Sequence, residues 1–571
     1  MTAPTPSLGP TARAAALDAL ATTSFDVLVV GGGVVGAGAA LDAVTRGLSV
    51  GLVEARDWAS GTSSRSSKLV HGGLRYLEML DFRLVAEALR ERSLLLNRLA
   101  PHLVRPVSFL YPLTGRGWER PYVGAGIALY DAMAAVLGRG ERLPRHRHLT
   151  RRGARALAPA LSSSALVGAV QYWDAQVDDA RHTMMIARTA AFYGASCAAR
   201  VRVIGLLREG ERVTGARVKD LESGRELDVR AQQVVNATGV WTDDTQGLAQ
   251  TRGQFHVRAS KGVHLLVPRD RIASSTGLIL RTETSVLFVI PWGRHWIIGT
   301  TDTDWSLDKS HPAVSASDVR YLLSELNQVL ASPLVPEDVV GVYAGLRPLL
   351  AGESELTSKL SREHLVAHPV PGLVVVAGGK YTTYRIMAKD AVDEAVRAMD
   401  GVSATSVTED VPLVGADGWP ALWNRRHALA QESGLHVARI EHLLQRFGSL
   451  THEVLALIAA DPDLGLPLPS SDDYLRAEVV YATSEEGALH LDDVLARRTR
   501  ISIESWDRGV DAAPVVADLM GDVLGWSPEQ RQREIEHYLA RVSAEREAQV
   551  QPNDLTADAA RLGAPDIVPL G

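Results

Sequence analysis

A glycine-rich turn between an apolar strand and a helix constrains this chain more than any other feature. Residues 26–30 (DVLVV) form an apolar run typical of a buried parallel strand. Gly31, Gly32, Gly33 and Gly36 follow it in the pattern G-x-G-x-x-G. Gly31 permits the tight turn, Gly33 lets the backbone approach a pyrophosphate, and Gly36 allows the helix to pack closely on the strand. The pattern predicts an α/β domain that binds a dinucleotide.

An acidic residue follows at the spacing that such a domain requires. The sequence predicts a helix over 34–46 and a second strand over 49–53, which leads into Glu54, 18 residues after Gly36. A carboxylate there accepts hydrogen bonds from the adenosine ribose, which favours FAD or NAD over NADP. The fingerprint does not choose between FAD and NAD. The hydroxyl- and glycine-rich loop 59–76 suits an extended cofactor, and an exposed serine-rich loop is the alternative.

Composition narrows the chemistry further. The 571 residues correspond to about four domain equivalents. The 60 Lys and Arg against 67 Asp and Glu give a net charge of −7, which argues against a nucleic-acid partner. The single cysteine, Cys197, excludes intramolecular disulfides and thiolate metal centres and points to a reducing compartment. We expect no metal site, no signal peptide and no membrane span, since no apolar run reaches about 20 residues.

One segment departs from the overall charge. Between Arg116 and Arg155 there are nine arginines and three acids, a local net charge of +6. The apolar stretch 118–137 lies within it and carries aromatic residues toward its edges. Basic flanks around such a stretch suit shallow insertion into an anionic membrane surface. The alternative is a buried helix with a solvated basic rim.

Eight distinctive sequence blocks follow one another over residues 25–400. They are VVGGGVVGAG (29–38), TSSRSSKLVHGGLRYLE (62–78), FRLVAEALRER (82–92), VNATGVW (235–241), KGVHLLVP (261–268), IIGTTDTD (297–304), GLRPL (345–349) and GGKYTTYR (378–385). In this order the blocks resemble the FAD-dependent, quinone-linked (aerobic) glycerol-3-phosphate dehydrogenases. The helical remainder, with RRTRI at 497–501, resembles the family's C-terminal domain less sharply. Tyr381 stands where the family pattern has leucine, which should alter the packing beside the flavin.

The resemblance implies an α/β fold: a glutathione-reductase-type, Rossmann-like FAD-binding domain with an interleaved, mostly β substrate domain and a helical C-terminal domain. The expected segments are an N-terminal extension (1–24), FAD-binding parts (25–110, 161–250 and 346–405), a basic and apolar membrane-facing segment (111–160), a substrate-binding β domain (251–345), a helical C-terminal domain (406–548) and a flexible tail (549–571).

The resemblance also implies an activity. It is the oxidation of sn-glycerol 3-phosphate to dihydroxyacetone phosphate by hydride transfer to FAD, with electrons passed to membrane quinone in glycerol catabolism. Such an enzyme would be cytoplasmic and peripheral on the inner face of the plasma membrane. Whether it forms a homodimer stays an open question. Three alternatives are an oxygen-dependent glycerophosphate oxidase that produces hydrogen peroxide, an NAD-dependent dehydrogenase and a non-enzymatic flavin-binding scaffold.

The resemblance assigns site residues by block. His264 is the candidate base for the C2 hydroxyl, although a lone strand histidine is more often structural. Arg347 stays protonated and is assigned charge stabilisation. The substrate-binding candidates are Arg75, Tyr76, Thr300, Lys380 and Thr383. The cofactor-binding candidates are Gly31, Gly32, Gly33, Gly36, Glu54, Ala55, Thr62, Ser63, Ser64, Ser67, His71, Gly72, Leu74, Val201, Ala237, Gly239, Gly379, Lys380 and Thr382.

Overall fold

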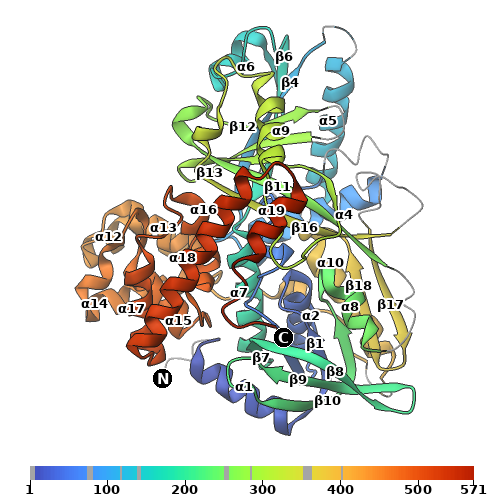
Figure 1. Cartoon of the computed structure of the whole chain (residues 1–571). Helices are drawn as coiled ribbons and strands as arrows, with labels where there is room; N and C mark the ends of the chain where they lie inside the picture. Colours follow the sequence, from blue (N-terminus) through green and yellow to red (C-terminus); the bar gives the residue numbers. More distant parts are fainter. Residues whose placement is uncertain are drawn as a thin grey trace.

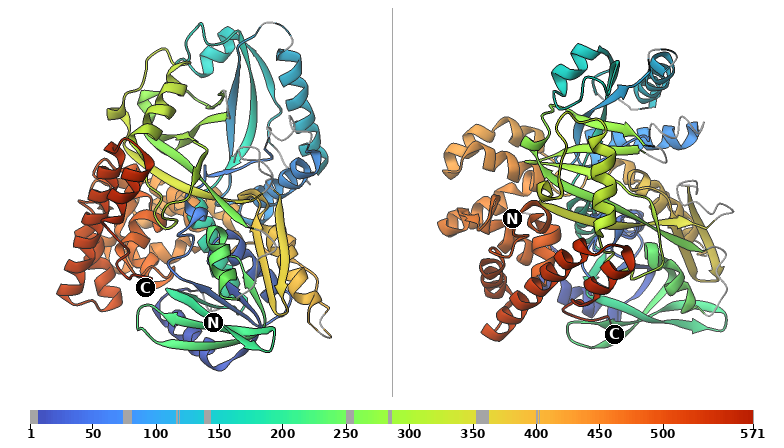
Figure 2. Two further views of the ribbon diagram at one scale, coloured as in Figure 1. Left: turned by 45° about the vertical axis from the view of Figure 1, so that its right-hand side comes forward. Right: turned by 45° about the horizontal axis from the view of Figure 1, so that its top comes forward.

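Two β-sheets lie one above the other, and a helical body packs beside both of them (Figures 1 and 2). The structure is a computed structural model. It describes residues 7–73, 81–115, 117, 119–137, 143–249, 256–282, 286–351, 363–399, 401 and 403–570. The predicted fold class is confirmed, because a parallel sheet with helices, a mostly antiparallel sheet and a helical C-terminal body are all present.

The first sheet is built on the strand that precedes the glycine-rich turn. Its order is β17-β18-β10-β1-β2-β7, and β8 and β9 extend it from β10. The pairs from β18 to β7 are parallel, whereas β17 and β9 run antiparallel to their neighbours. Its strands are β1 (Ser24–Val30), β2 (Val50–Glu54), β7 (Ser196–Ala199), β8 (Val201–Glu209), β9 (Arg212–Asp220), β10 (Glu226–Asn236), β17 (His364–Val370) and β18 (Leu373–Gly378).

Both faces of β1 are covered, which explains its unbroken apolar sequence. Val27 and Val29 pack in one core with helices α2 (Val34–Thr45), α7 (Asp179–Phe192) and α10 (Tyr384–Arg397). Leu28 and Val30 point the other way, because side chains alternate along a strand, and pack with α1 (Pro10–Thr22) and the β8–β9 pair.

The second sheet is centred on β11 (Val257–Pro268), which pairs with three other strands. Helix α9 (Ala316–Asn327) covers the face that carries Val263, Leu265 and Val267. The apolar runs HLLVP, VLFVIPW and HWIIG lie in β11, β13 and β14. The remaining strands are β3 (Leu69–Val70), β4 (Arg105–Leu113), β5 (Arg147–Thr150), β6 (Gly168–Gln176), β12 (Gly277–Arg281), β13 (Val286–Trp292), β14 (His295–Gly299), β15 (Thr303–Trp305) and β16 (Gly341–Leu350).

Several predicted domain borders are corrected by the strand pairing. β6 falls within a segment expected in the FAD-binding domain (161–250), and β4 crosses the border expected between residues 110 and 111, but both strands lie in the second sheet. β16 crosses the border expected between residues 345 and 346. An apolar run predicts a strand but carries no information about which sheet the strand joins.

Both ends of the described chain contain a helix. The N-terminal lead forms α1, where Leu20 is buried and the Arg13 Nε donates to the carbonyl of Ala199 over 3.0 Å. The tail predicted to be flexible contains helix α19 (Asp554–Leu562), with Ala557 fully buried. The expectation of a flexible tail was wrong because a few apolar residues, well spaced, are enough to hold a short helix against a larger body.

The C-terminal body is helical, and buried ion pairs join it to the first sheet domain. Arg498 forms two bonds to Asp57, and Arg181 pairs with Glu486 at 2.7 Å. A short hairpin lies at the proline-rich stretch after α14. The elements are α11 (Trp419–Asn424), α12 (Arg426–Ser433), α13 (Val437–Phe447), α14 (Thr451–Ala460), β19 (Pro467–Leu468), β20 (Ser471–Leu475), α15 (Arg476–Ser484), α16 (Ile501–Glu504), α17 (Ala513–Leu524) and α18 (Pro528–Val550).

One junction between these bodies yields a prediction about stability. His490 is buried, with its two ring nitrogens 2.8 Å from Glu534 and 3.0 Å from Glu222. Burial and Arg200 oppose its charge, but the two carboxylates raise the pKa of His490 to about 9. Charged His490 therefore adds stability that is complete below the unfolded pKa of about 6.5 and is lost as the pH rises through 9.

We expect His490→Gln to lower the free energy of unfolding by roughly 3 kcal/mol more at pH 6 than at pH 9.5. Urea unfolding at the two pH values measures this difference. His452→Gln, at an exposed position of the same helical body, serves as the control and should show no such pH dependence. An equal loss at both pH values for His490→Gln would contradict the assignment.

Candidate active site

A cavity of about 770 Å³ lies between the two sheets, a size within the ~300–1,000 Å³ typical of small-molecule and cofactor sites. Its lining comes from the ends of β1, β2, β10 and β18 in the first sheet and from β11 and β16 in the second. The carboxyl ends of parallel strands meet at one edge of an open sheet, where ligands bind in α/β folds.

The glycine-rich turn has the geometry expected of a pyrophosphate site. Gly31 has a φ of +111°, a conformation that only glycine adopts easily. A side chain at Gly36 would place its Cβ 1.9 Å from the carbonyl oxygen of Gly31, so the helix could not pack this closely. Gly33 lies at the start of α2, where unpaired N–H groups favour an anion. The Ser63 Oγ accepts a bond from the Val34 N–H over 2.9 Å at this helix end.

Glu54 lies at the end of β2 and lines the cavity. Its carboxylate accepts backbone N–H bonds from Gly32 at 2.6 Å and Arg56 at 2.7 Å. Burial raises the pKa of Glu54, and the two N–H bonds act against that rise. These bonds fix the carboxylate beside the turn, in the position that a ribose-binding acid requires.

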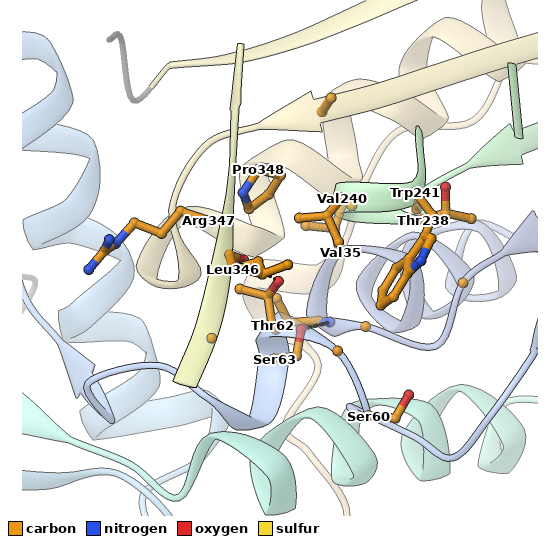
Figure 3. A pocket seen from close by; sticks show the side chains of 18 of the residues that line it. Val35, Ser60, Thr62, Ser63, Thr238, Val240, Trp241, Leu346, Arg347 and Pro348 are labelled. Atoms are coloured by element: carbon orange, nitrogen blue, oxygen red, sulfur yellow. Dashed lines mark hydrogen bonds between the residues drawn. The ribbon is translucent and has the colours of Figure 1, made fainter. Parts of the chain in front are cut away.

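The hydroxyl-rich loop connects the two halves of the cavity (Figure 3). The Thr62 Oγ1 donates to the carbonyl of Leu346 on β16 over 2.6 Å, which joins the loop to the second sheet. Ser60 and Ser63 also line the cavity. The prediction that this loop follows a cofactor, and is not a plain exposed turn, agrees with this placement.

The strand register of the second sheet brings distant residues to one face. Residues 260, 262 and 264 alternate onto the same face of β11. Opposite them on β16 lie Arg347 beside Ser260, Gly345 beside Gly262, and Tyr343 beside His264. The glycines leave room for their neighbours, because a Cβ at Gly262 would come within 2.5 Å of the Arg347 guanidinium.

His264 is buried and held on two sides. Its Nε2 lies 2.8 Å from the Ser67 Oγ, and its ring stacks on Tyr343 with 4.7 Å between centroids. Its Nδ1 has no hydrogen-bond partner among the residues that the structure describes. Burial, and then the positive charges of Arg347 and Lys68, hold the pKa of His264 well below its usual range. The imidazole is therefore neutral at pH 7 and able to accept a proton.

Arg347 is oriented by oxygen acceptors on β11 and in the loop between β14 and β15. Its guanidinium donates to the Thr300 Oγ1 at 3.0 Å, the Thr301 carbonyl at 3.1 Å and the Ser260 Oγ at 3.3 Å. Figure 3 shows the side chain pointing away from Ser63 and Trp241, toward the opposite end of the pocket. Arg347 thus presents a fixed positive charge in the half of the cavity that contains His264.

The third wall follows β18, where Gly378 and Gly379 both have positive φ values near 80°. Lys380 and Thr382 come next and line the cavity. The Thr382 Oγ1 accepts a bond from the His71 N–H over 3.2 Å.

Tyr381 also lines this wall, and its hydroxyl reaches away to the start of α7. The hydroxyl donates to the Asp179 carbonyl at 2.8 Å and lies 2.9 Å from the His182 Nδ1. The tyrosine therefore joins the wall of the cavity to α7, and its phenol oxygen is held by the protein.

The cavity brings together most of the predicted site residues. Outside its lining are Gly32, Gly36, Ser64 and Gly72, and the two substrate candidates Thr300 and Thr383; Thr300 instead orients Arg347, and Thr383 is buried beneath the turn. Leu74, Arg75 and Tyr76 lie outside the described residues. The predicted residues that line the cavity are Gly31, Gly33, Glu54, Ala55, Thr62, Ser63, Ser67, His71, Val201, Ala237, Gly239, His264, Arg347, Gly379, Lys380 and Thr382.

Other lining residues were not predicted. Trp241 and Thr238 stand in the VNATGVW block and could have been found there, since that block follows a strand of the first sheet. Arg56 and Leu346 are direct neighbours of predicted residues. Leu570 carried no signal at all, because the last residues of the chain were expected to be flexible.

The residues present fit FAD. The open start of α2 suits a pyrophosphate and Glu54 a ribose. A Cβ added at Gly61 would lie 3.1 Å from the Trp241 ring, so the loop and this ring enclose the cavity closely. A neutral histidine and an arginine face the far half. Fold and site together define a flavin-dependent oxidoreductase with separate cofactor and substrate halves.

Comparison with known proteins agrees with this class. Residues 26–389 match the family model "FAD dependent oxidoreductase", and residues 406–531 match "C-terminal domain of alpha-glycerophosphate oxidase". Glycerol-3-phosphate dehydrogenase 2 of Mycobacterium tuberculosis is 59% identical over 99% of this chain and 96% of its own. The mitochondrial glycerol-3-phosphate dehydrogenase of Mus musculus is 39% identical over 92% of this chain and 74% of its own.

Solved structures show the same relationship. The FAD complex of the Bacillus halodurans glycerol-3-phosphate dehydrogenase has a TM-score of 0.77 and 27% identity, covering 95% of this chain and 98% of that one. The α-glycerophosphate oxidase of Mycoplasma pneumoniae shares the fold, with a TM-score of 0.52 and 18% identity over 67% of this chain and 97% of that one. The chain belongs to the glycerol-3-phosphate dehydrogenase family of FAD-dependent oxidoreductases, and its cofactor is FAD. The NAD-dependent and non-enzymatic alternatives are thereby excluded.

Proposed function

We propose that the enzyme oxidises sn-glycerol 3-phosphate to dihydroxyacetone phosphate and passes the electrons to a membrane quinone in glycerol catabolism. The observation that carries the proposal is the register of β11 and β16, which places His264 and Arg347 on one face of the cavity. Relatives named as glycerol-3-phosphate dehydrogenases, 59% identical over 99% of this chain, support it.

The neutral and the positively charged side chains of the cavity have different roles in this reaction. Neutral His264 takes the proton of the C2 hydroxyl, and the Ser67 hydroxyl holds its ring at Nε2. Arg347 and Lys380 attract the substrate dianion, and the fixed Arg347 guanidinium stabilises negative charge that develops on the substrate oxygens. Bound FAD supplies the acceptor for the hydride that leaves C2.

Anaerobic spectroscopy of the purified holoenzyme tests this proposal. Glycerol 3-phosphate should bleach the flavin bands, glycerol should not, and a water-soluble quinone should restore the colour. An intact flavin spectrum after excess glycerol 3-phosphate would overturn the proposed substrate.

The oxygen-dependent oxidase is the second candidate, because the C-terminal family model carries the name of alpha-glycerophosphate oxidase. In air, without quinone, an oxidase would form one hydrogen peroxide per substrate oxidised. A quinone-linked enzyme should form little peroxide under these conditions. The peroxide yield therefore decides between the two electron acceptors.

We further propose that helix α5 (Glu119–Leu137) docks the enzyme on the inner face of the plasma membrane. Ile127 and Tyr130 are buried against the protein, whereas Leu129 and Val136 are 43% and 81% exposed. Five arginines near this helix in the sequence are exposed as well: Arg145, Arg147, Arg151, Arg152 and Arg155. Helix α5 lies at the outer edge of the upper domain (Figure 1), and within the described chain no helix is long and apolar enough to cross a membrane.

We expect the double variant Leu129→Ser/Val136→Ser to bind anionic phospholipid vesicles about tenfold more weakly than the wild type, because each substitution removes apolar area that would enter the membrane interface. Co-sedimentation at low salt measures it, and added salt should weaken wild-type binding. The matched control is Leu539→Ser/Val550→Ser, two exposed apolar residues on α18. Equal binding by both double variants would contradict docking through α5.

A further inference from the structure

The last described residues of the chain reach the cofactor cavity. Leu570 lines it, in the region formed by Val201, Arg202 and Val203. The backbone carbonyl of Leu570 accepts a bond from the Arg202 guanidinium. These residues follow β7, which pairs with β2 next to Glu54, so Leu570 lies at the ribose end of the cavity and not at the His264 end.

The segment is fastened to that end by an ion pair. One oxygen of Asp566 accepts from the Arg56 Nε at 2.8 Å, and the other lies 2.7 Å from the His311 Nε2. Although burial opposes its charge, His311 and Arg56 hold the pKa of Asp566 well below the usual range. An ionised carboxylate only accepts, so His311 donates from Nε2.

Arg56 connects this fastening to the cofactor site. Its backbone N–H donates to the Glu54 carboxylate, its guanidinium lies 5.6 Å from the centre of the Trp241 ring, and it lines the cavity. The Arg56 Nη2 also donates to the Ser310 Oγ over 2.8 Å. Arg56, which contacts Asp566, is thus bonded both to Glu54, the ribose acid, and to Ser310.

The other side of the segment is held by the C-terminal helices. The Arg561 guanidinium donates to the Ala564 carbonyl at 2.7 Å, and the Arg533 guanidinium to the Ile567 carbonyl at 3.1 Å. The His537 Nε2 lies 2.7 Å from the Pro565 carbonyl. Backbone carbonyls therefore attach the segment to α18 and α19, while Asp566 and Leu570 attach it to the cofactor cavity.

We propose that residues 564–570 form a strap over the adenosine end of the FAD site, and that the Arg56–Asp566–His311 contact sets the rate at which FAD leaves. The strap assigns the C-terminal body a role in retaining the cofactor, which is independent of the substrate and of the electron acceptor. Its opening would expose the ribose end without disturbing His264 or Arg347.

The test measures FAD release from the holoenzyme after dilution, as the recovery of free-flavin fluorescence. Asp566→Asn removes the negative charge from the Arg56–Asp566–His311 contact and should accelerate FAD release about tenfold. His311→Ala should accelerate FAD release as well. Deleting residues 564–571 should accelerate FAD release about a hundredfold, because Leu570 and the contact of Asp566 with Arg56 and His311 are lost together. Asp518→Asn, which removes an exposed ion pair with Arg531 on the same body, is the matched control and should release FAD like the wild type.

The proposal would be overturned if Asp566→Asn and the truncated chain both released FAD at the wild-type rate. It would also be overturned if neither these variants nor the wild type released measurable FAD. Equal thermal unfolding of the variants in saturating FAD separates a local effect from misfolding. Because the readout is free flavin, the result stands whether or not glycerol 3-phosphate is the substrate. Failure of the proposed function would instead show as a flavin that glycerol 3-phosphate does not bleach.

Discussion

Arg347→Ala is expected to lower kcat/KM for glycerol 3-phosphate by about 10²- to 10³-fold while FAD stays bound. The guanidinium is oriented by Ser260, Thr300 and Thr301 before any substrate arrives, so its charge needs no reorganisation during the reaction. Its side chain points away from the Ser63 and Trp241 side of the pocket, which is why cofactor binding should survive (Figure 3). Steady-state rates with a dye acceptor and the visible spectrum of the variant measure the two effects.

Two further variants sharpen this prediction. Arg347→Lys keeps the charge but loses the planar fork of donors, so it should recover only part of the activity. Arg258→Ala lies on the same strand β11 and removes an arginine paired with Asp304 outside the cavity, so it should stay near the wild-type rate. Substrate-dependent bleaching at an unchanged rate in Arg347→Ala would show that the guanidinium has no part in the reaction.

The features predicted well from the sequence are those whose parts lie close together along the chain. The strand, the turn and the ribose acid span residues 26–54, and each follows from a local requirement such as the +111° φ of Gly31. Glu54 could be placed because the distance from the turn to the end of β2 is set by one helix and one strand.

The contacts that orient the site could not be predicted in the same way. Ser67 and His264 are 197 residues apart, and Ser260 and Arg347 are 87 apart. Ser67 lies in the loop before β3, and its contact with His264 depends on how that loop folds onto β11. The Ser260–Arg347 contact depends on the register between β11 and β16, which shifts every side chain to the other face if it slips by one residue. The sequence alone does not determine that register between distant strands.

Resemblance and structure also contribute differently at single positions. Thr300 was expected to bind substrate, and the structure shows it accepting a bond from Arg347. Tyr381 was expected to change packing beside the flavin; it lines the cavity, and its hydroxyl also bonds the start of α7, a contact that the sequence did not indicate. The order of the chain's end was missed, because the contact between Asp566 and Arg56 joins residues 510 positions apart and leaves no local pattern.

His264→Gln is expected to lower kcat by about 10²- to 10⁴-fold, the range that a positioned general base contributes. Because burial, Arg347 and Lys68 lower the pKa of His264, the wild-type enzyme keeps the neutral, active imidazole at pH 6.5 and loses kcat/KM only as the pH falls through that lowered pKa. The acid limb of the wild-type profile should therefore lie below pH 6.5, and it should be absent from His264→Gln.

Ser67→Ala separates the base from the group that positions it. Removing the hydroxyl that lies 2.8 Å from Nε2 keeps the His264 imidazole but removes the bond that orients it. Activity should therefore fall less than in His264→Gln, and the acid limb should still be present but at a different pH. A structural histidine would behave otherwise: His264→Gln would unfold at a lower temperature and keep both its rate and its acid limb. Full pH profiles of the three proteins, with thermal unfolding beside them, distinguish a proton acceptor from a residue that only fills the sheet.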